Sequence, residues 1–336
     1  MKKLKVAVLM GGPSSEHEVS LHSGEEVLKN LDKNKYNVLP VTIDKRGFWL
    51  FTGPKSQPLS EPEGILMLQR NNVDVAFIAM HGEYGEDGTV QYILRAGDIP
   101  FTGSHTLQSA LAMNKAVSAS ILKNHGLMTP EFVTVHSTQW HKNPATIVRE
   151  AVSKIGLPLV VKPSNRGSSV GVNLIRELDN LKFTKVIQAV DHALSFGQEA
   201  MIQKYITGRE LTCAILEHGG VPQPILPTEI KPAKNDFFDY SSKYAESGAE
   251  EITPPELMSK DMIKNIQETA LTAHKALGCR GLSRTDMILG HDKNLYVLEV
   301  NTLPGLTSTS LLPKAALASG INFPKLLDII IDSALV

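Results

Sequence analysis

The sequence is poor in cysteine: Cys213 and Cys279 are its only two, and they lie far apart in a chain of 336 residues. Two cysteines are too few for a disulfide framework or a cysteine-rich zinc site. The simplest interpretation of each is a small, buried apolar side chain in a reducing compartment. We therefore expect a cytoplasmic protein.

The sequence also lacks an excess of one charge and a long apolar run. Lys and Arg number 34 against 35 Asp and Glu, a formal net charge of -1. This balance provides no broad basic face, so we expect neither nucleic acid nor a membrane surface as a partner. No stretch approaches the ~18 apolar residues of a membrane-spanning helix.

What remains is an ordinary globular composition, with 42% hydrophobic and 21% charged residues. Buried strands are predicted at Lys5 to Met10, Val73 to Met80 and Ile99 to Phe101, with helices between them. Alternating strands and helices are typical of a doubly wound α/β domain, whose ligands bind at the carboxyl ends of the strands. Glu16 and His81 both fall at such ends.

Changes of pattern divide the chain into three domains. Residues 1–103 form the N-terminal α/β substrate-binding domain. Residues 104–202 form a central α+β unit with a Gly/Ser loop, and residues 203–336 form the last domain. The polar stretch from Lys231 to Pro255 has no clear period, which is typical of a functional lid or a disordered segment.

A predicted hairpin near the end of the chain places two carboxylates together. Centring its turn on Asp292 and Lys293 makes Asp286 face Glu299 and Arg284 face Asn301. Opposed carboxylates repel unless a cation lies between them, and oxygen ligands of this kind suit Mg²⁺. The alternative is a solvated polar face, or a register shifted by one residue.

The loop of residues 164–171 follows Lys162 and is rich in Gly and Ser, so its backbone N–H groups can bind phosphate. It matches neither the P-loop nor the dinucleotide-binding motif, and a plain hairpin tip is the alternative. Lysines that can hold a triphosphate stand beside such loops, although each alone is more commonly a surface lysine. They are Lys115, Lys162, Lys204 and Lys243.

Six motifs occur in order along the whole chain. They are GGPSSEHEVS at 11–20, HG with GEDG at 81–88, KPS with GSSVG at 162–171, DY with KY at 239–244, RTD at 284–286 and EVNTLPGLTSTSL at 299–311. Together they resemble the D-alanine:D-alanine ligases of the ATP-grasp superfamily. The resemblance implies an ATP-grasp fold with an N-terminal, doubly wound parallel-sheet domain.

The resemblance also implies a reaction, which serves peptidoglycan synthesis. ATP phosphorylates the carboxylate of one D-alanine, and the amine of a second D-alanine attacks the acyl phosphate. ATP is the co-substrate, two Mg²⁺ ions are the cofactors with Mn²⁺ as a substitute, and a homodimer is expected. Two alternatives stay open: a relative that forms a mixed product such as D-alanyl-D-lactate, and a nucleotide-binding protein without catalysis.

The resemblance assigns roles residue by residue. The expected metal ligands are Asp286, Glu299 and Asn301. The lysines expected to hold phosphate are Lys115, Lys162 and Lys243. The residues expected to contact adenine and ribose are Gln203, Lys204, Ile206 and Glu210. Arg284 and the Gly305 N–H hold the developing oxyanion, and Ser310 and Leu311 bind the second substrate's carboxylate. Glu16 binds the first substrate's ammonium near His81 and forms a hydrogen-bonded triad with Ser168 and Tyr244. Gln203 departs from the family, which often has Glu there.

Overall fold

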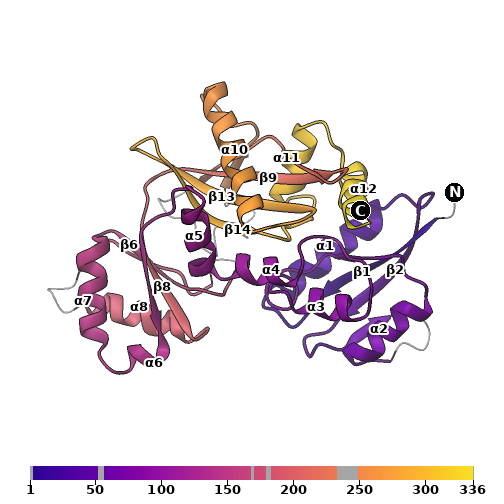
Figure 1. The fold of residues 1–336 in the computed structure, drawn as a ribbon, viewed down its shortest axis with the longest axis horizontal. Coiled ribbons are helices and arrows are strands. Elements are labelled where there is room, and N and C mark those ends of the chain that lie inside the picture. Colours follow the sequence, from indigo (N-terminus) through magenta and orange to yellow (C-terminus); the bar gives the residue numbers. More distant parts are fainter. Residues whose placement is uncertain (1–2, 52–56, 168–169, 179–182, 233–248, 336) are drawn as a thin grey trace.

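The computed structural model describes residues 3–51, 57–167, 170–178, 183–232 and 249–335. Three sheets form three lobes (Figure 1): the N-terminal sheet at the lower right, a central sheet at the lower left, and the largest sheet above them. None of the helices within these ranges is long and apolar enough to cross a membrane.

The N-terminal sheet has the order β3-β2-β1-β4, with β1 (Leu4–Gly11), β2 (Tyr36–Ile43), β3 (Trp49–Phe51) and β4 (Val75–Ile78). β1 is parallel to β2 and β4, and only the edge strand β3 is antiparallel. Its helices are α1 (His17–Asn30), α2 (Glu61–Arg70) and α3 (Thr89–Ala96). The predicted parallel sheet is confirmed, although Phe101 makes only an isolated bridge to Ala76.

The central sheet is antiparallel, with the order β5-β8-β6-β7. Its strands are β5 (Phe132–His136), β6 (Leu159–Pro163), β7 (Asn173–Ile175) and β8 (Glu199–Lys204), and its helices are α6 (Ser137–Trp140), α7 (Pro144–Ile155) and α8 (Thr184–Leu194). A separate apolar core holds this lobe together. β8 continues past the predicted boundary between residues 202 and 203, so the central lobe extends to Lys204.

The C-terminal sheet has the order β12-β11-β9-β13-β14, with β10 paired to β9. Its strands are β9 (Gly208–His218), β10 (Val221–Pro224), β11 (Thr228–Pro232), β12 (Ala249–Ile252), β13 (Leu282–Gly290) and β14 (Leu295–Asn301). The helices α4 (Thr106–Met113), α5 (Lys115–Asn124), α10 (Lys260–Ala276), α11 (Leu311–Ala318) and α12 (Phe323–Ala334) complete the fold. The two ends of the predicted lid, residues 231–255, lie in and beside β11 and β12. Residues 233–248 of that segment lie outside the described residues.

Helix α12 joins the last lobe to the first. Its apolar residues, among them Leu326, Leu327 and Ile330, belong to the same core as β1. In the same helix, the buried Asp328 accepts hydrogen bonds from Tyr36 Oη at 2.7 Å and from Lys35 Nζ at 2.6 Å. This packing sets the carboxyl ends of β1 and β4 opposite the β13–β14 hairpin.

The two cysteines are free thiols, as the sequence suggests. Cys213 is fully buried in the core of the C-terminal sheet, and Cys279 packs against that core. Burial raises the pKa of each thiol to about 12, so neither is a thiolate near neutral pH.

Candidate active site

A cavity of about 360 Å³ lies between the N-terminal and C-terminal lobes. The predicted site residues that line it are Glu16, His81, Glu210, Arg284, Asp286, Glu299, Asn301, Gly305, Ser310 and Leu311. They come from segments nearly 300 residues apart in sequence. The fold therefore brings most of the predicted site to one place.

In the cavity, Asp286 accepts four hydrogen bonds from neighbouring side chains. Arg284 donates to both of its carboxylate oxygens, each at 2.8 Å. Thr212 Oγ1 donates to it at 2.7 Å, and Asn301 Nδ2 at 3.1 Å. These four bonds fix the carboxylate on a rigid strand, because Arg284, Asp286 and Thr212 all lie in paired strands of one sheet.

The second carboxylate lies directly opposite. Glu299 on β14 pairs in register with Asp286 on β13, as the sequence predicts. Glu299 Oε2 lies 3.1 Å from Lys115 Nζ, at the start of α5. Each of the two opposed carboxylates thus has its own cationic partner.

The Arg284 guanidinium keeps its charge in this setting. Burial lowers its pKa, but the charge and hydrogen bonds of Asp286 outweigh burial and raise the pKa above its ordinary value. The Glu299 charge adds to this rise. A fixed positive charge in a cavity is suited to stabilising negative charge that develops on a reacting group.

The donor set fits a hard divalent cation. Asp286, Glu299 and the Asn301 amide offer oxygen ligands on two adjacent strands. Within the described ranges, no group of three or more His, Cys, Asp or Glu residues can hold a metal ion. A cation bound here would therefore need the Asn301 oxygen beside the two carboxylates, which is the predicted trio.

His81 is held at the other side of the cavity. Its Nδ1 donates to the Leu303 carbonyl at 3.1 Å, and its Nε2 lies 2.8 Å from Ser23 Oγ. Nδ1 is also 3.9 Å from Glu86 Oε1. Burial lowers the pKa of His81, but Glu86 and Glu16 outweigh it, so the pKa is raised.

Glu86 lines the cavity, although sequence reasoning gave it no role. Burial, together with the Glu16 charge, raises its pKa against the opposing effect of His81. The available signal was its place in the GEDG motif, where Glu86 stands beside Asp87, four positions after Gly82. Its Oε2 accepts from the Gly82 N–H at 3.1 Å.

Glu16 stands between two glycines from different lobes. A Cβ on Gly82 would lie 2.8 Å from Glu16 Oε2, and a Cβ on Gly167 would lie 3.2 Å from the same atom. Ser14 Oγ accepts from the Glu16 N–H at 2.8 Å and donates to the His81 carbonyl at 2.9 Å. The Glu16 carboxylate therefore lies between the backbones of two loops. The hydrogen bonds of Ser14 also fix the backbone at the start of α1.

Gly305 and Ser310 lie together at the start of α11. A Cβ on Gly305 would meet Ser310 Oγ at 2.7 Å. Ser310 Oγ accepts from the Thr307 N–H at 3.1 Å and lies 2.7 Å from Thr307 Oγ1. This tight turn presents Ser310 and Leu311 to the cavity.

Three predicted residues lie on strands of the central sheet and a fourth follows the last of these strands; none of the four is part of this cavity's lining. Lys162 is buried on β6, and Gln203 on β8 is 3% exposed with no partner for Nε2 among the described residues. Lys204 Nζ donates to the Ile155 carbonyl at 3.2 Å, at the end of α7, and Ile206 follows β8. Ser168, Lys243 and Tyr244 lie outside the described residues, so their predicted roles stay predictions.

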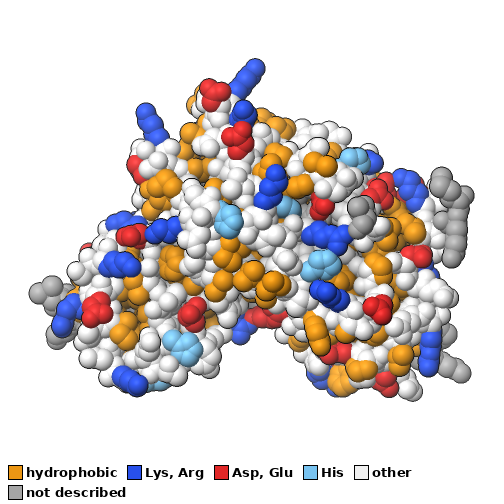
Figure 2. Space-filling view, viewed as in Figure 1, with side chains coloured by type: hydrophobic (Ala, Val, Ile, Leu, Met, Phe, Trp, Pro, Cys, Tyr) orange, Lys and Arg blue, Asp and Glu red, His pale blue; other side chains and the backbone are white. Residues whose placement is uncertain are grey.

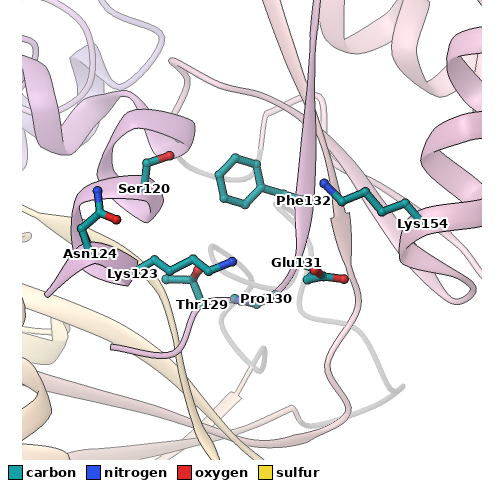
Figure 3. Close-up of a pocket in the computed structure, with 8 residues that line it drawn as sticks. All are labelled: Ser120, Lys123, Asn124, Thr129, Pro130, Glu131, Phe132 and Lys154. Atoms are coloured by element: carbon teal, nitrogen blue, oxygen red, sulfur yellow. The ribbon is translucent and has the colours of Figure 1, made fainter. Parts of the chain in front are cut away.

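A second cavity, of about 250 Å³, lies where α5 meets β5 and α7. Figure 3 shows Lys123 of α5 and Lys154 of α7 on either side of Phe132. No predicted site residue lines it. This second cavity lies between two lobes, so it is part of the junction where the central lobe meets α5.

Comparisons with known proteins match this chain to one family of ligases. Two family models match, "D-ala D-ala ligase N-terminus" over residues 5–104 and "D-ala D-ala ligase C-terminus" over residues 121–332. The D-alanine–D-alanine ligase of Clostridium beijerinckii is 38% identical over 332 residues, which is 99% of each chain.

Solved structures agree. The VanG D-Ala:D-Ser ligase from Enterococcus faecalis superposes with a TM-score of 0.82 at 31% identity, covering 99% of this chain and 100% of that one. The D-alanine–D-alanine ligase from Bacillus anthracis complexed with ATP gives 0.76 at 32% identity, covering 99% and 97%.

Proposed function

The chain belongs to the D-alanine–D-alanine ligase family, and on that premise we propose that it uses ATP to join two D-alanines for peptidoglycan synthesis. It is an ATP-dependent ligase with the ATP-grasp fold. The observation that carries the proposal is the cavity that holds Glu16, Arg284 and the Asp286–Glu299 pair together. A protein that only bound a nucleotide would have no need of a buried, permanently charged Arg284 beside a cation-binding pair of carboxylates.

The reaction proceeds in two steps. A carboxylate oxygen of the first D-alanine attacks the γ-phosphorus of ATP, ADP leaves, and an acyl phosphate forms. The free amine of the second D-alanine then attacks the acyl carbon and loses a proton. The tetrahedral adduct collapses as its C–O bond to phosphate breaks, which leaves the amide.

The residues divide this work by charge and position. Glu16, an anion, suits the ammonium group of the first D-alanine. Arg284 and the Gly305 N–H suit the oxyanion of the adduct, since both are fixed by the fold before the reaction begins. Ser310 and Leu311, at the start of α11, suit the carboxylate of the second D-alanine.

The proposal also includes a metal site. Asp286, Glu299 and Asn301 would hold Mg²⁺, two ions with Mn²⁺ as a substitute, and the metal would neutralise phosphate charge. Lys115 and Lys162 add positive charge nearby, and Lys243 is assigned to the phosphates by resemblance. Gln203, Lys204, Ile206 and Glu210 are proposed to contact adenine and ribose.

A different second substrate is the main alternative. The VanG structure is titled as a D-Ala:D-Ser ligase, and it superposes over the whole chain. The decisive experiment measures ADP release with ATP, Mg²⁺ and D-alanine, D-serine or D-lactate as the second substrate, with products identified by mass. A product other than D-alanyl-D-alanine as the major species overturns the proposed choice.

We also propose a homodimer in the cytoplasm, where ATP is available. Apolar side chains gather over α4 in Figure 2, and Leu107 is 62% and Val117 39% exposed. A second copy covering this surface would bury them. Light scattering should give twice the 36.6 kDa of one chain, and Leu107→Glu should lower that mass. A monomeric wild type contradicts the proposal.

A further inference from the structure

Arg166, in the loop after β6, contacts three separate parts of the chain. Its Nη1 forms an ion pair with Oε1 of Glu83, in the loop after β4. Its Nε donates to the Phe196 carbonyl at 2.9 Å, just after α8. Its own carbonyl accepts from Lys115 Nζ at 2.6 Å, and Lys115 in turn pairs with Glu299. One residue thus connects the N-terminal lobe, the central lobe and the carboxylate pair.

The ion pair spans the Glu16 carboxylate. Gly82 directly precedes Glu83, and Gly167 directly follows Arg166. Both glycines lie so near Glu16 Oε2 that an added Cβ would meet it at 2.8 Å from Gly82 and 3.2 Å from Gly167. The Arg166–Glu83 pair therefore fixes the distance between the Gly82 loop and the Gly167 loop at the point where Glu16 lies between them.

The setting makes this pair stronger than an ordinary surface pair. The side chains are 36% and 29% exposed, so solvent screens them only in part. The bond from Arg166 Nε to Phe196 orients the guanidinium before it meets Glu83, which reduces the entropy lost on pairing.

We propose that Arg166 and Glu83 are positioning residues for the first substrate. Their ion pair holds the Gly167 backbone of the central lobe against Glu16 of the N-terminal lobe. The binding place for the first D-alanine's ammonium is complete only when the two loops are joined. This inference rests on the proposed function, because that function assigns Glu16 to the first D-alanine.

The first test uses Glu83→Gln, which removes the charge and keeps the shape. We expect the KM for the first D-alanine to rise about fivefold, as loss of a ~1 kcal/mol pair implies, with the KM for ATP changed less than about twofold. The matched control is Glu177→Gln, since Glu177 pairs with Lys185 at 3.4 Å on the exposed surface of the central lobe, which also contains Arg166. It should leave both KM values unchanged.

A second readout does not depend on the reaction. Trypsin cleaves after Arg166, so the rate of that cut, followed by the mass of its fragment, reports how firmly the loop is held. Without ligands, Glu83→Gln should be cut about fivefold faster than wild type or Glu177→Gln.

Charge exchange tests whether the two residues act as a pair. Glu83→Arg and Arg166→Glu alone should each raise the KM for the first D-alanine. The double variant should recover part of the loss, although not all, because a carboxylate at 166 cannot donate to Phe196. A merely structural role for either residue predicts additive damage.

The outcomes separate this inference from the proposed function. Equal cleavage and equal KM in Glu83→Gln and Glu177→Gln overturn the positioning role, as does faster cleavage with an unchanged KM for the first D-alanine. Failure of the wild type to form D-alanyl-D-alanine overturns the proposed function instead, whatever the cleavage rates show.

Discussion

Asp286 and Glu299 face each other across β13 and β14, and each carboxylate is paired with a different cation. Asp286 is bound by Arg284 through two hydrogen bonds, while Glu299 lies against Lys115. Two like charges in register would destabilise the hairpin on their own. The fold offsets this repulsion from both sides, and the two carboxylates therefore differ in what they contribute to stability.

Asp286→Asn should abolish ligation and also destabilise the protein. The substitution leaves the buried Arg284 charge without its partner, which costs about 3 kcal/mol for a buried pair. Glu299→Gln should abolish ligation with a loss of about 1 kcal/mol or less, because Lys115 keeps its bond to the Arg166 carbonyl. Urea unfolding and ADP release measure both effects. Equal stability losses in the two variants would contradict the different roles assigned to the cations.

The hairpin register shows what sequence arithmetic can predict. Pairing about Asp292 and Lys293 gives Asp286 opposite Glu299, and the structure confirms that pair. Near the turn, however, Leu289 pairs with Leu295, one position away from the predicted register. A bulge between Asp286 and Met287 corrects the shift. Alternation of side chains does not reveal a bulge, so the agreement at the site depends on a feature that the sequence pattern does not contain.

Some elements around the site follow from the sequence pattern, and others do not. The doubly wound sheet and the ends of β1 and β4 follow from continuous apolar runs, which predict Glu16 and His81 near strand ends, and both residues line the cavity. β2 was not predicted, because Pro40 and Asn37 interrupt its apolar pattern. The Arg166–Glu83 pair joins two loops whose approach depends on how the lobes pack. Local residue patterns carry no record of that packing.

Stability should fall as pH rises above 6.5, because of His81 and Glu86. Both pKa values are raised, so the folded protein holds protons that the unfolded chain releases above the ordinary values of 6.5 and 4.5. Each contribution is present at low pH and is lost as pH rises through the folded pKa. Glu86→Gln should flatten the slope above pH 6.5, measured by urea unfolding, because it also removes the carboxylate that raises the pKa of His81.

His274 provides the control for that slope. Burial, with the Lys275 charge, lowers its pKa to about 4. Its contribution to stability is therefore complete above pH 6.5 and is lost as pH falls toward 4. His274→Gln should leave the slope above pH 6.5 as in wild type. If Glu86→Gln also left it unchanged, His81 and Glu86 would not be its source.

Gln203→Glu should lower the KM for ATP about threefold. The buried Gln203 leaves its Nε2 donor without a partner among the described residues, whereas a carboxylate has no donor to satisfy and accepts more strongly from the adenine amino group. The KM for D-alanine should not change. Gln203→Met, which removes the acceptor, should raise the KM for ATP. A change confined to the KM for D-alanine would show that Gln203 does not contact adenine.

Gly82→Ala should weaken binding of the first D-alanine far more than it weakens the fold. Gly82 has a φ of +73°, and an added Cβ would meet Ser14 Oγ at 2.5 Å and Glu16 Oε2 at 2.8 Å. The methyl group must therefore displace the carboxylate that is proposed to bind the ammonium. We expect the KM for the first D-alanine to rise at least ~10-fold, which corresponds to ~1.4 kcal/mol of lost binding.

Gly47→Ala separates this displacement from the cost of the backbone conformation. Gly47 has a similar φ of +88°, but an added Cβ there has no atom within 4 Å among those described. Both variants should lose about 1 kcal/mol of stability from placing Ala at positive φ. Only Gly82→Ala should also raise the KM for the first D-alanine, since only its methyl group reaches Glu16. Equal KM values in the two variants would mean that Glu16 does not bind the first substrate.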